Sequence, residues 1–321
     1  MVRIGVTAVW HSHRHTCSIQ KVERFTRENR SCRRPANIPP AVREAPAFTP
    51  GRMSLFDVLF IMNIQINSNI IELATKTAEM GGIIALEKQE EVSSMKKADS
   101  SIVTEADKKV ERKITRKLQE NSEYDVIGEE YGGNTNKSAY WIIDPIDGTR
   151  NYSLGQPIFA TSIALVRDNS PVACAVNFPA LNKTFYAEEN EGAYLNNKRI
   201  SVRNKEYDGY NMIGLARRDK NRLYNSLKNN FSKIQIPKGA VYSACSVAAG
   251  WTDGAILTGL QPWDVASGVI LIREAGGEVE NLNLKSNKWS NICNKGFYWN
   301  SESTIKNEIL STFNDSEIEY V

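Results

Sequence analysis

Apolar residues recur at helical spacing in two long segments of the chain. The first covers residues 66–89 and is interrupted by the pair Gly81-Gly82. The second covers residues 104–120, where Thr104 followed by Asp107 is typical of the capping box that begins a helix. Since residues three and four apart share one face of a helix, both segments predict helices that bury an apolar face.

Short apolar runs between turn-forming residues predict strands in the middle of the chain. Two of these runs lie at Tyr124–Gly128 and Tyr140–Ile143. Three more are spaced as an antiparallel meander, at Ile158–Val166, Pro171–Asn177 and Lys183–Ala187.

After Gly192 the pattern mixes both kinds of element. Strands are predicted at Met212–Leu215 and Asp253–Leu257, and helices at Asp219–Phe231, Val265–Ala275 and Thr304–Phe313. Helices that follow strands in this way cover the faces of sheets. The expected fold class is therefore α/β (α+β).

Residues 1–61 differ in composition from the rest of the chain. They hold ten basic residues, nine of them Arg, against four acidic ones, and five of the eleven prolines lie within residues 35–50. The whole chain has 40 basic and 37 acidic residues, which leaves 30 and 33 for residues 62–321. The pI near 8.5 therefore belongs to the N-terminal segment, and it does not predict nucleic-acid binding.

We expect residues 1–61 to be a disordered extension, or sequence upstream of a true start at Met62. A targeting or anion-binding arm is the alternative. Residues 62–321 are expected to form the catalytic domain, with the metal site in residues 62–190 and substrate recognition in residues 191–321. Deletion of residues 1–61 should leave activity intact.

Histidine and cysteine usage excludes several kinds of site from residues 16–321. The three histidines lie at positions 11, 13 and 15, so this part of the chain has no Ser-His-Asp triad and no histidine-ligated zinc. Five scattered cysteines form no CxxC pair, which indicates reduced thiols and a cytoplasmic setting. The apolar run at residues 55–66 is too short to cross a bilayer, so we expect no membrane partner.

Acidic residues gather where predicted elements end or begin. Glu129-Glu130 follow one strand, and Asp264 directly precedes an apolar helix. Asp144 and Asp147 follow another strand, and Pro145 between them is expected to stop strand pairing. Two carboxylates three residues apart across a bend can point at a common centre.

The chemistry of this acidic set points to a divalent cation. Carboxylate oxygens are hard ligands that select Mg²⁺ or Ca²⁺, and several of them in one pocket repel unless a cation neutralises them. Asp147-Gly148-Thr149 is expected to form a turn into a helix, whose first N–H groups suit phosphate. Without histidine, metal-bound water is the natural source of the nucleophile, so the residues predict metal-assisted hydrolysis of a phosphate ester.

Each acidic segment alone has an ordinary explanation. Glu129-Glu130 fits a solvated turn, Asp264 fits a helix N-cap, and Asp144–Thr149 fits a turn built from Asp, Pro and Gly. The combination, in this order and with these flanks, carries the hypothesis.

In that combination the chain resembles the inositol monophosphatase family of Mg²⁺-dependent, lithium-sensitive phosphatases, over roughly residues 66–310. Four ordered motifs carry the resemblance: Asp-Ser-Ser-Ile-Val-Thr-Glu-Ala-Asp107 after Lys96, Ile-Gly-Glu-Glu130, Trp-Ile-Ile-Asp-Pro-Ile-Asp-Gly-Thr-Arg-Asn-Tyr152, and Trp-Asp-Val-Ala-Ser-Gly268 with Glu-Ala-Gly-Gly277. It implies a layered αβαβα sandwich of the inositol monophosphatase/fructose-1,6-bisphosphatase type, assembled as a homodimer.

The resemblance also implies two to three Mg²⁺ ions in each site. Glu129, Asp144 and the carbonyl of Ile146 would hold the first ion. Asp144, Asp147 and Asp264 would hold the second, and a looser third ion would lie near Glu129.

Catalytic and substrate-binding roles follow from the same resemblance. Thr149, paired with Asp107, would orient and activate the attacking water beside Glu129. The amides of Gly148 and Thr149 would bind phosphate, with Asp264 at the substrate. Glu130 would support the ligands rather than bind metal itself.

The substrate-recognising half departs from the family pattern. Inositol-directed members carry an acidic residue seven positions before the Trp-Asp aspartate, where this chain has Leu257. The segment Gly239–Ser246 also differs from the usual run, and the chain resembles the microbial, particularly archaeal, branch. Arg150 either reaches a substrate phosphate or pairs with surface acids, the second being the better interpretation for an exposed Arg.

The leading hypothesis is a phosphomonoesterase that hydrolyses inositol-1-phosphate or related sugar phosphates, fructose 1,6-bisphosphate included, by attack of a metal-activated water. One alternative is a phosphatase for 3′-phosphoadenosine 5′-phosphate. The other is a metal-dependent binding protein without turnover. The expected partner is a small phosphorylated polyol or sugar.

Overall fold

The computed structural model describes residues 55–94, 100–133, 137–203, 212–217, 228, 233–258, 260–281 and 297–300. The chain divides into two compact units, Met1–Arg52 and Met53–Val321, and every described element belongs to the second. The helix predicted at 304–313 lies outside the described residues, as does the one at 219–231 apart from Lys228.

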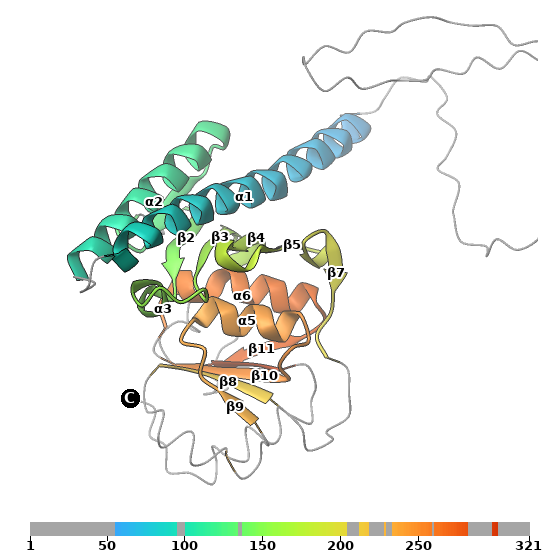
Figure 1. Ribbon diagram of the computed structural model, residues 1–321. Helices are drawn as coiled ribbons and strands as arrows, with labels where there is room; N and C mark the ends of the chain where they lie inside the picture. The colour runs from blue at the N-terminus through green and yellow to red at the C-terminus, as the bar shows by residue number, and fades with distance from the viewer. Residues whose placement is uncertain are drawn as a thin grey trace, which may run out of the picture. The chain divides into compact units, whose positions relative to one another are not determined.

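The second unit is layered (Figure 1). Helices α1 (Leu55–Ser94) and α2 (Ser100–Asn121) cover one face of a seven-stranded sheet. Helices α5 (Ala240–Ala248) and α6 (Pro262–Glu274) lie between that sheet and a five-stranded one. The described residues thus form four layers in the order αβαβ, which agree with the first four layers of the expected αβαβα sandwich.

The seven-stranded sheet follows chain order, with β1 and β2 parallel and all later neighbours antiparallel. Its strands are β1 (Asp125–Gly128), β2 (Ala139–Asp147), β3 (Ala160–Arg167), β4 (Ser170–Phe178), β5 (Lys183–Glu188), β6 (Gly192–Leu195) and β7 (Lys198–Ile200). A single 3-10 turn, Pro179–Leu181, links β4 to β5. The predicted meander is confirmed as β3, β4 and β5.

The five-stranded sheet has the order β11-β12-β10-β8-β9. Its strands are β8 (Met212–Arg217), β9 (Lys233–Gln235), β10 (Gly254–Thr258), β11 (Glu278–Asn281) and β12 (Phe297–Asn300). The predicted strands at Met212–Leu215 and Asp253–Leu257 correspond to β8 and β10, which pair in parallel.

Strand β2 supplies side chains to both hydrophobic cores. Tyr140 and Ile142 face the core shared with α5 and α6, whereas Trp141 and Ile143 face the core under α1 and α2. Because successive side chains of a strand point to opposite faces, a strand covered on both sides is apolar throughout. This explains the continuous apolar run that leads into Asp144.

Helix α1 passes through Gly81-Gly82 without a break, so the predicted interruption is wrong. A Cβ on Gly81 would lie 2.8 Å from Thr161 Cγ2, and one on Gly82 would lie 2.0 Å from Asn177 Oδ1. At these two glycines α1 therefore packs closely against β3 and β4. Their role is close packing rather than helix termination.

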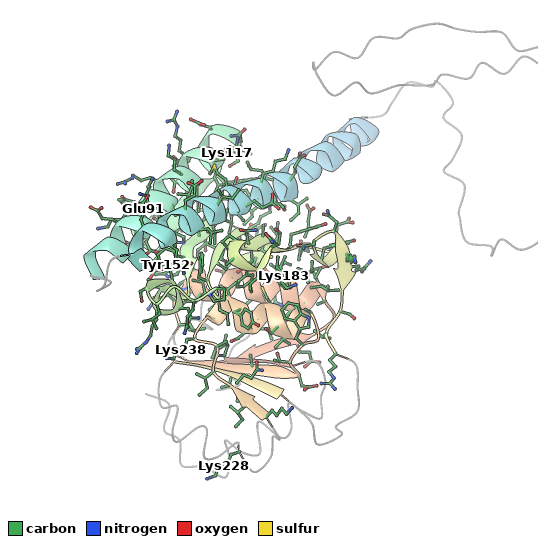
Figure 2. All side chains as sticks on the ribbon, in the orientation of Figure 1. Glu91, Lys117, Tyr152, Lys183, Lys228 and Lys238 are labelled. Carbon is green, nitrogen blue, oxygen red and sulfur yellow. The ribbon has the colours of Figure 1, made fainter. Side chains whose placement is uncertain are left out.

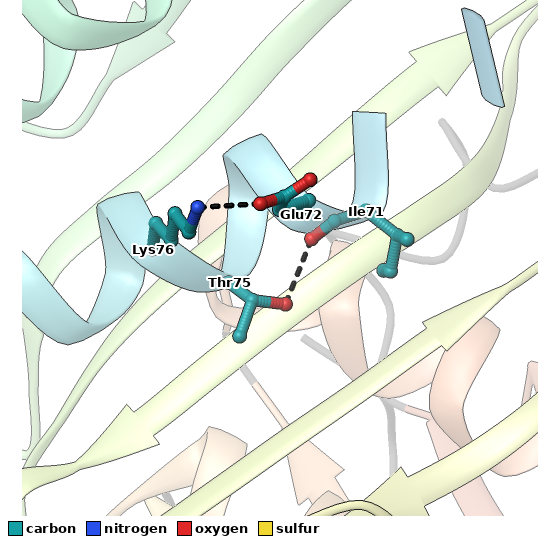
Figure 3. A network of polar contacts seen from close by, with 4 residues as sticks. All are labelled: Ile71, Glu72, Thr75 and Lys76. Atoms are coloured by element: carbon teal, nitrogen blue, oxygen red, sulfur yellow. Dashed lines mark hydrogen bonds and ion pairs between the residues drawn. The ribbon is translucent and has the colours of Figure 1, made fainter. Parts of the chain in front are cut away.

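Helix α1 begins at Leu55, seven residues before the expected domain start at Met62. Its first described buried side chain is Ile70, followed on the same face by Ala74 and Ala78. Figure 3 shows the solvent side of this turn, where Lys76 pairs with Glu72 and Thr75 Oγ1 donates to the Ile71 carbonyl at 2.8 Å. Such exposed pairs contribute little, so the buried face holds the helix in place.

Other element boundaries also differ from the prediction. Helix α2 begins at Ser100, so Thr104 lies inside it and does not cap it. Helix α5 was not predicted, since its small and apolar sequence shows no polar face. Within the described helices, none has the length and apolar character needed to cross a membrane.

Candidate metal and phosphate site

Asp144 and Asp147 lie at the two ends of a β-bulge in β2. Asp144 pairs with Ser162 and Asp147 with Ala160. The chain therefore advances three residues along β2 where it advances only two along β3, which leaves one extra residue in β2. Pro145 has no backbone N–H, so its place in the bulge leaves no donor unpaired. Its carbonyl accepts a hydrogen bond from Thr161 Oγ1 at 2.9 Å. The strand therefore continues to Asp147, and the expectation that Pro145 stops pairing is wrong.

The bulge turns both aspartates toward one side. The backbone N–H of Ile146 donates to Asp144 Oδ1 at 3.1 Å, which fixes the Asp144 carboxylate against its own backbone. After the bulge, Gly148 takes φ 81°, and a Cβ there would lie 2.9 Å from the Ile158 carbonyl. Glycine is needed at this position both for the left-handed backbone and for the close approach.

The short helix α3 (Thr149–Ser153) begins directly after Gly148, which confirms the predicted turn into a helix. Asn151 Nδ2 donates to the carbonyls of Ile158 and Pro237, at 2.8 and 2.9 Å. Tyr152 Oη donates to the Ala85 carbonyl on α1 at 2.9 Å. These contacts fix Thr149 between the sheet, α1 and the segment before α5.

Asp264 enters the site from α6. Gln261 is the N-cap, and its backbone N–H donates to Asp264 Oδ2 at 2.8 Å in a capping box. Asp264 is thus in the first turn of the helix rather than at its N-cap. The helix start fixes the direction in which this carboxylate points.

Asp144, Asp147 and Asp264 form one cluster. Each offers a carboxylate oxygen, and the three oxygens lie within 4.8 Å of one another. Two of these residues come from β2 and the third from α6, more than a hundred positions along the chain. The convergence predicted from the sequence is therefore present for these three residues.

Glu129 is exposed and lines the same cleft, but it is not part of that close group. It lies in the turn after β1, and its negative charge contributes to the raised pKa of both Asp144 and Asp107. Glu129 is therefore near the cluster, on the side of α2. The backbone of Glu130 in the same turn donates to Glu111 rather than toward the cleft.

Asp107 is only 4% exposed, and its Oδ1 atom has no hydrogen-bond partner. Thr149 Oγ1 donates to the Ile146 carbonyl at 3.1 Å. Among the residues that the structure describes, no hydrogen bond joins Thr149 to Asp107. The expected ligand atom of Ile146 and the expected activator Thr149 therefore contact each other directly.

Burial and mutual repulsion raise the pKa of the acidic groups in this site. The pKa of Asp147 is raised to about 7, mainly by burial and by Asp264, although the N–H of Ala240 partly opposes the rise. The pKa of Asp107 is raised to about 8 by burial and then by Glu129. The pKa of Asp144 is raised as well, first by burial of the carboxylate and then by the negative charge of Glu129.

The donor set fits a hard divalent cation. Three carboxylates converge, Asp147 Oδ2 is buried without a hydrogen-bond partner, and no described histidine or cysteine joins the group. Positive charge between the carboxylates would relieve the repulsion that raises each pKa. Oxygen-only ligands of this kind suit Mg²⁺ or Ca²⁺.

The cluster opens into a cleft of about 520 Å³. Its lining includes Gly148 and Thr149 from the beginning of α3 and Gln261 and Trp263 from the beginning of α6. This volume falls in the range of small-molecule sites.

Two cations line the same cleft. Arg150 lies at the start of α3, and Lys238, labelled in Figure 2, lies just before α5. Neither forms an ion pair with any residue that the structure describes, and the interpretation of Arg150 as a partner of surface acids stays a prediction.

Leu257 does not line the cleft. It is completely buried on β10 and belongs to the core against α5 and α6. The position that holds an acidic residue in inositol-directed members is thus part of the packing here.

Three contributors were missed from the sequence. Glu111 is a buried carboxylate one helical turn after Asp107, and the spacing of four residues could have revealed it. The N–H of Ala240 donates to Asp147 Oδ1 at 3.1 Å, a long-range contact with no local signal. Lys238 follows a proline in an irregular segment, so nothing in the pattern marked it.

The amino-acid sequence is similar to those of known phosphatases. The model of the inositol monophosphatase family matches residues 66–317. A fructose-1,6-bisphosphatase/inositol-1-monophosphatase of Aquifex aeolicus is 34% identical over 220 residues, which cover 64% of this chain and 83% of that protein. A histidinol-phosphatase of Mycobacterium tuberculosis is 33% identical over 199 residues, covering 58% and 76%.

A solved structure is also similar. The IMPase of Thermotoga maritima superposes with a TM-score of 0.67 at 27% identity, over 75% of this chain and 94% of that one. The relatives differ in the substrates that their names state, whereas family and fold are shared. Together with the acidic cluster at the bulge of β2, the matches show that this chain belongs to the inositol monophosphatase family and is a phosphatase that hydrolyses phosphomonoesters.

Proposed function

We propose that the chain is a Mg²⁺-dependent phosphomonoesterase that hydrolyses inositol-1-phosphate or related sugar phosphates, fructose 1,6-bisphosphate included. The observation that carries this proposal is the convergence of Asp144, Asp147 and Asp264 in a cleft that Arg150 and Lys238 also line. A phosphorylated substrate needs both features, since cations must balance the phosphate and the carboxylates must hold the metal.

The ligand assignments follow the cluster. Asp144, Asp147 and Asp264 would hold one ion, and Asp144, Glu129 and the Ile146 carbonyl a second. Two to three Mg²⁺ ions balance the four carboxylate charges and part of the phosphate charge. When bound, Mg²⁺ supplies Lewis-acid polarisation of the phosphate and of the attacking water.

The residues of this chain position the reactants. Gly148 and Thr149 at the beginning of α3 line the cleft, and their amides are proposed to bind phosphate oxygens, with Asp264 also at the substrate. Thr149 is proposed to orient the attacking water and Asp107 to accept its proton, although the two side chains share no hydrogen bond in this structure. The raised pKa of Asp107 supports a role in proton transfer near neutral pH.

The substrate preference rests on the walls of the cleft. Leu257 is buried outside the cleft and supplies no group for an inositol hydroxyl, whereas Arg150 and Lys238 line the cleft and can each bind an anionic group. These two cations favour substrates with a second phosphate over simple polyol monophosphates.

A substrate panel tests the proposal. Phosphate release from inositol-1-phosphate, fructose 1,6-bisphosphate and 3′-phosphoadenosine 5′-phosphate should depend on Mg²⁺ and be inhibited by Li⁺. Preferred turnover of the adenosine bisphosphate would instead assign a nucleotide phosphatase. No turnover of any substrate, with Mg²⁺ binding retained, would indicate a binding protein.

The proposal includes the oligomeric state and the cellular location of the protein. A homodimer is expected from the family resemblance, and light scattering coupled to gel filtration tests it. The free thiols of Cys174 and Cys245 are both buried, which supports the reducing environment of the cytoplasm.

A further inference from the structure

The carboxylate of Glu111 lies outside the cleft, beneath the turn that carries Glu129. Glu111 is 1% exposed on the face of α2 toward β1. Its two oxygens accept hydrogen bonds from successive backbone N–H groups: Oε2 from Glu130 at 2.9 Å and Oε1 from Tyr131 at 3.0 Å. A single buried carboxylate thus satisfies two donors of one turn.

That turn is closed on itself. Gly128 and Gly132 exchange backbone hydrogen bonds, at 3.1 Å from Gly128 N to Gly132 O and 3.0 Å in the reverse direction. The N–H groups of Glu130 and Tyr131 are therefore presented from a loop whose ends are fixed. Glu130 is half-buried and Tyr131 is exposed, so without Glu111 these two N–H groups would be left to water and the loop would lose the hydrogen bonds that hold it against α2.

Gly128 makes room for the carboxylate. A Cβ on this residue would lie 2.0 Å from Glu111 Oε1 and 2.8 Å from Oε2. Only glycine allows the approach, so Gly128 and Glu111 form one unit of the structure.

Glu129 lies between the two anchored parts of this loop. The Gly128–Gly132 bridge fixes one side of it, and the Glu130 N–H held by Glu111 fixes the other. The backbone of Glu129 is therefore set on both sides, while its side chain lines the cleft. Glu111 itself does not line that cleft.

We propose that Glu111 is a positioning residue that fixes Glu129 for metal binding by accepting the N–H groups of Glu130 and Tyr131; the inference rests on the proposed function of the site. It acts through the backbone and touches neither metal nor substrate. Residues that support a metal ligand in this way change metal affinity 10–100-fold when replaced.

Glu111→Gln tests the positioning role most directly. The side chain keeps its shape, but an amide has one acceptor oxygen where a carboxylate has two. One of the two N–H groups then faces an NH₂ group, so the loop loses a hydrogen bond. Gly128→Ala disturbs the same contact from the other side, and Glu120→Gln is the control, an exposed carboxylate of α2 that pairs with Arg116.

Two measurements separate positioning from a purely structural role. Amide hydrogen exchange in metal-free protein should become about tenfold or more faster at residues 130–131 in Glu111→Gln and Gly128→Ala, and stay unchanged in Glu120→Gln. Calorimetric titration with Mg²⁺ should show binding weakened about 10-fold or more in the first two variants only. Circular dichroism and thermal unfolding establish that each variant is folded.

The outcomes distinguish this inference from the proposed function. Faster exchange with unchanged Mg²⁺ affinity would overturn the positioning role, as would unchanged exchange in both variants. A wild-type protein that binds no Mg²⁺ would overturn the proposed function instead, and the exchange data would still show whether Glu111 holds the loop.

Discussion

The backbone N–H of Ala240 donates a hydrogen bond to Oδ1 of Asp147 at 3.1 Å, across 93 positions of sequence. This contact joins the beginning of α5 to the end of the bulge in β2. It orients the Asp147 carboxylate so that Oδ2 remains for another partner. Asp147 is therefore both part of the packing between two elements and part of the acidic cluster.

Asp147→Asn should abolish turnover with little loss of stability. The asparagine oxygen still accepts the Ala240 N–H, but the ligand charge is lost, so we expect kcat/KM to fall at least about 100-fold. Initial rates over a Mg²⁺ series check this, with thermal unfolding as the control for folding. Near-normal rates at saturating Mg²⁺ would contradict the assignment.

The stability of the metal-free protein should fall as the pH rises from about 4 to about 8. The pKa of Asp107 is about 8 in the folded protein, well above the 3.8 of an unperturbed Asp, because the group is buried beside Glu129 and Glu130. Its contribution to stability is fully present below the unfolded pKa and is lost as the pH passes the folded pKa.

Asp107→Asn provides the control for this pH dependence. The neutral side chain removes the titration, so we expect its unfolding temperature to exceed that of the wild type by about 5 °C at pH 8.5 and to match it near pH 4. Thermal unfolding in chelator at both pH values measures the difference. Parallel pH profiles for the two proteins would show that Asp107 does not titrate in this range.

Arg150→Gln and Lys238→Gln should each raise KM for fructose 1,6-bisphosphate about tenfold. A charged hydrogen bond to a second phosphate is worth about 1.5–3 kcal/mol, and neither cation has another ion-pair partner among the described residues. KM for inositol-1-phosphate should change much less. Lys198→Gln, an exposed lysine on β7, is the matched control, and equal effects on both substrates would argue against a second-phosphate site.

Gly82→Ala should destabilise the protein by about 1–3 kcal/mol, although Gly to Ala within a helix normally stabilises. The new Cβ would meet Asn177 Oδ1, and Asn177 is held by a hydrogen bond to Thr184. Chemical denaturation measures the change. Ile83→Ala, on the exposed side of the same helix, should have a small effect, and a stabilised Gly82→Ala would refute the close-packing role.

Deletion of residues 1–61 should leave kcat/KM unchanged. The family match begins at residue 66, and the first described buried side chain of α1 is Ile70. Comparison of the truncated and full-length proteins under identical conditions tests this. A loss of activity in a folded truncated protein would assign the N-terminal segment a role.

Local sequence patterns were enough for most of the fold and for the acidic cluster. The meander and α6 follow from periodicity, and Asp144, Asp147 and Asp264 were predicted to converge from their motifs. The path of α1 through Gly81-Gly82 was not predictable, because the sheet beneath it determines whether a glycine pair ends a helix or allows close contact.

The supporting contacts were the hardest part to predict. Glu111 and the Ala240 N–H act on residues that are distant in sequence, and only the packing of α2 and α5 brings them there. Similarly, the bulge at Pro145 depends on the Thr161 hydroxyl of the neighbouring strand. The motifs pointed to the acidic cluster, whereas the contacts that orient its carboxylates arise from tertiary structure.

The bulge of β2 has a consequence for loss and recovery of the metal. Pro145 has a fixed φ, and its carbonyl is held by Thr161, so the backbone between Asp144 and Asp147 has little freedom to relax. Protein stripped with a chelator should therefore regain full rate on mixing with Mg²⁺ within the dead time of the instrument. A slow recovery phase would mean that the ligands must first be rebuilt around the ion.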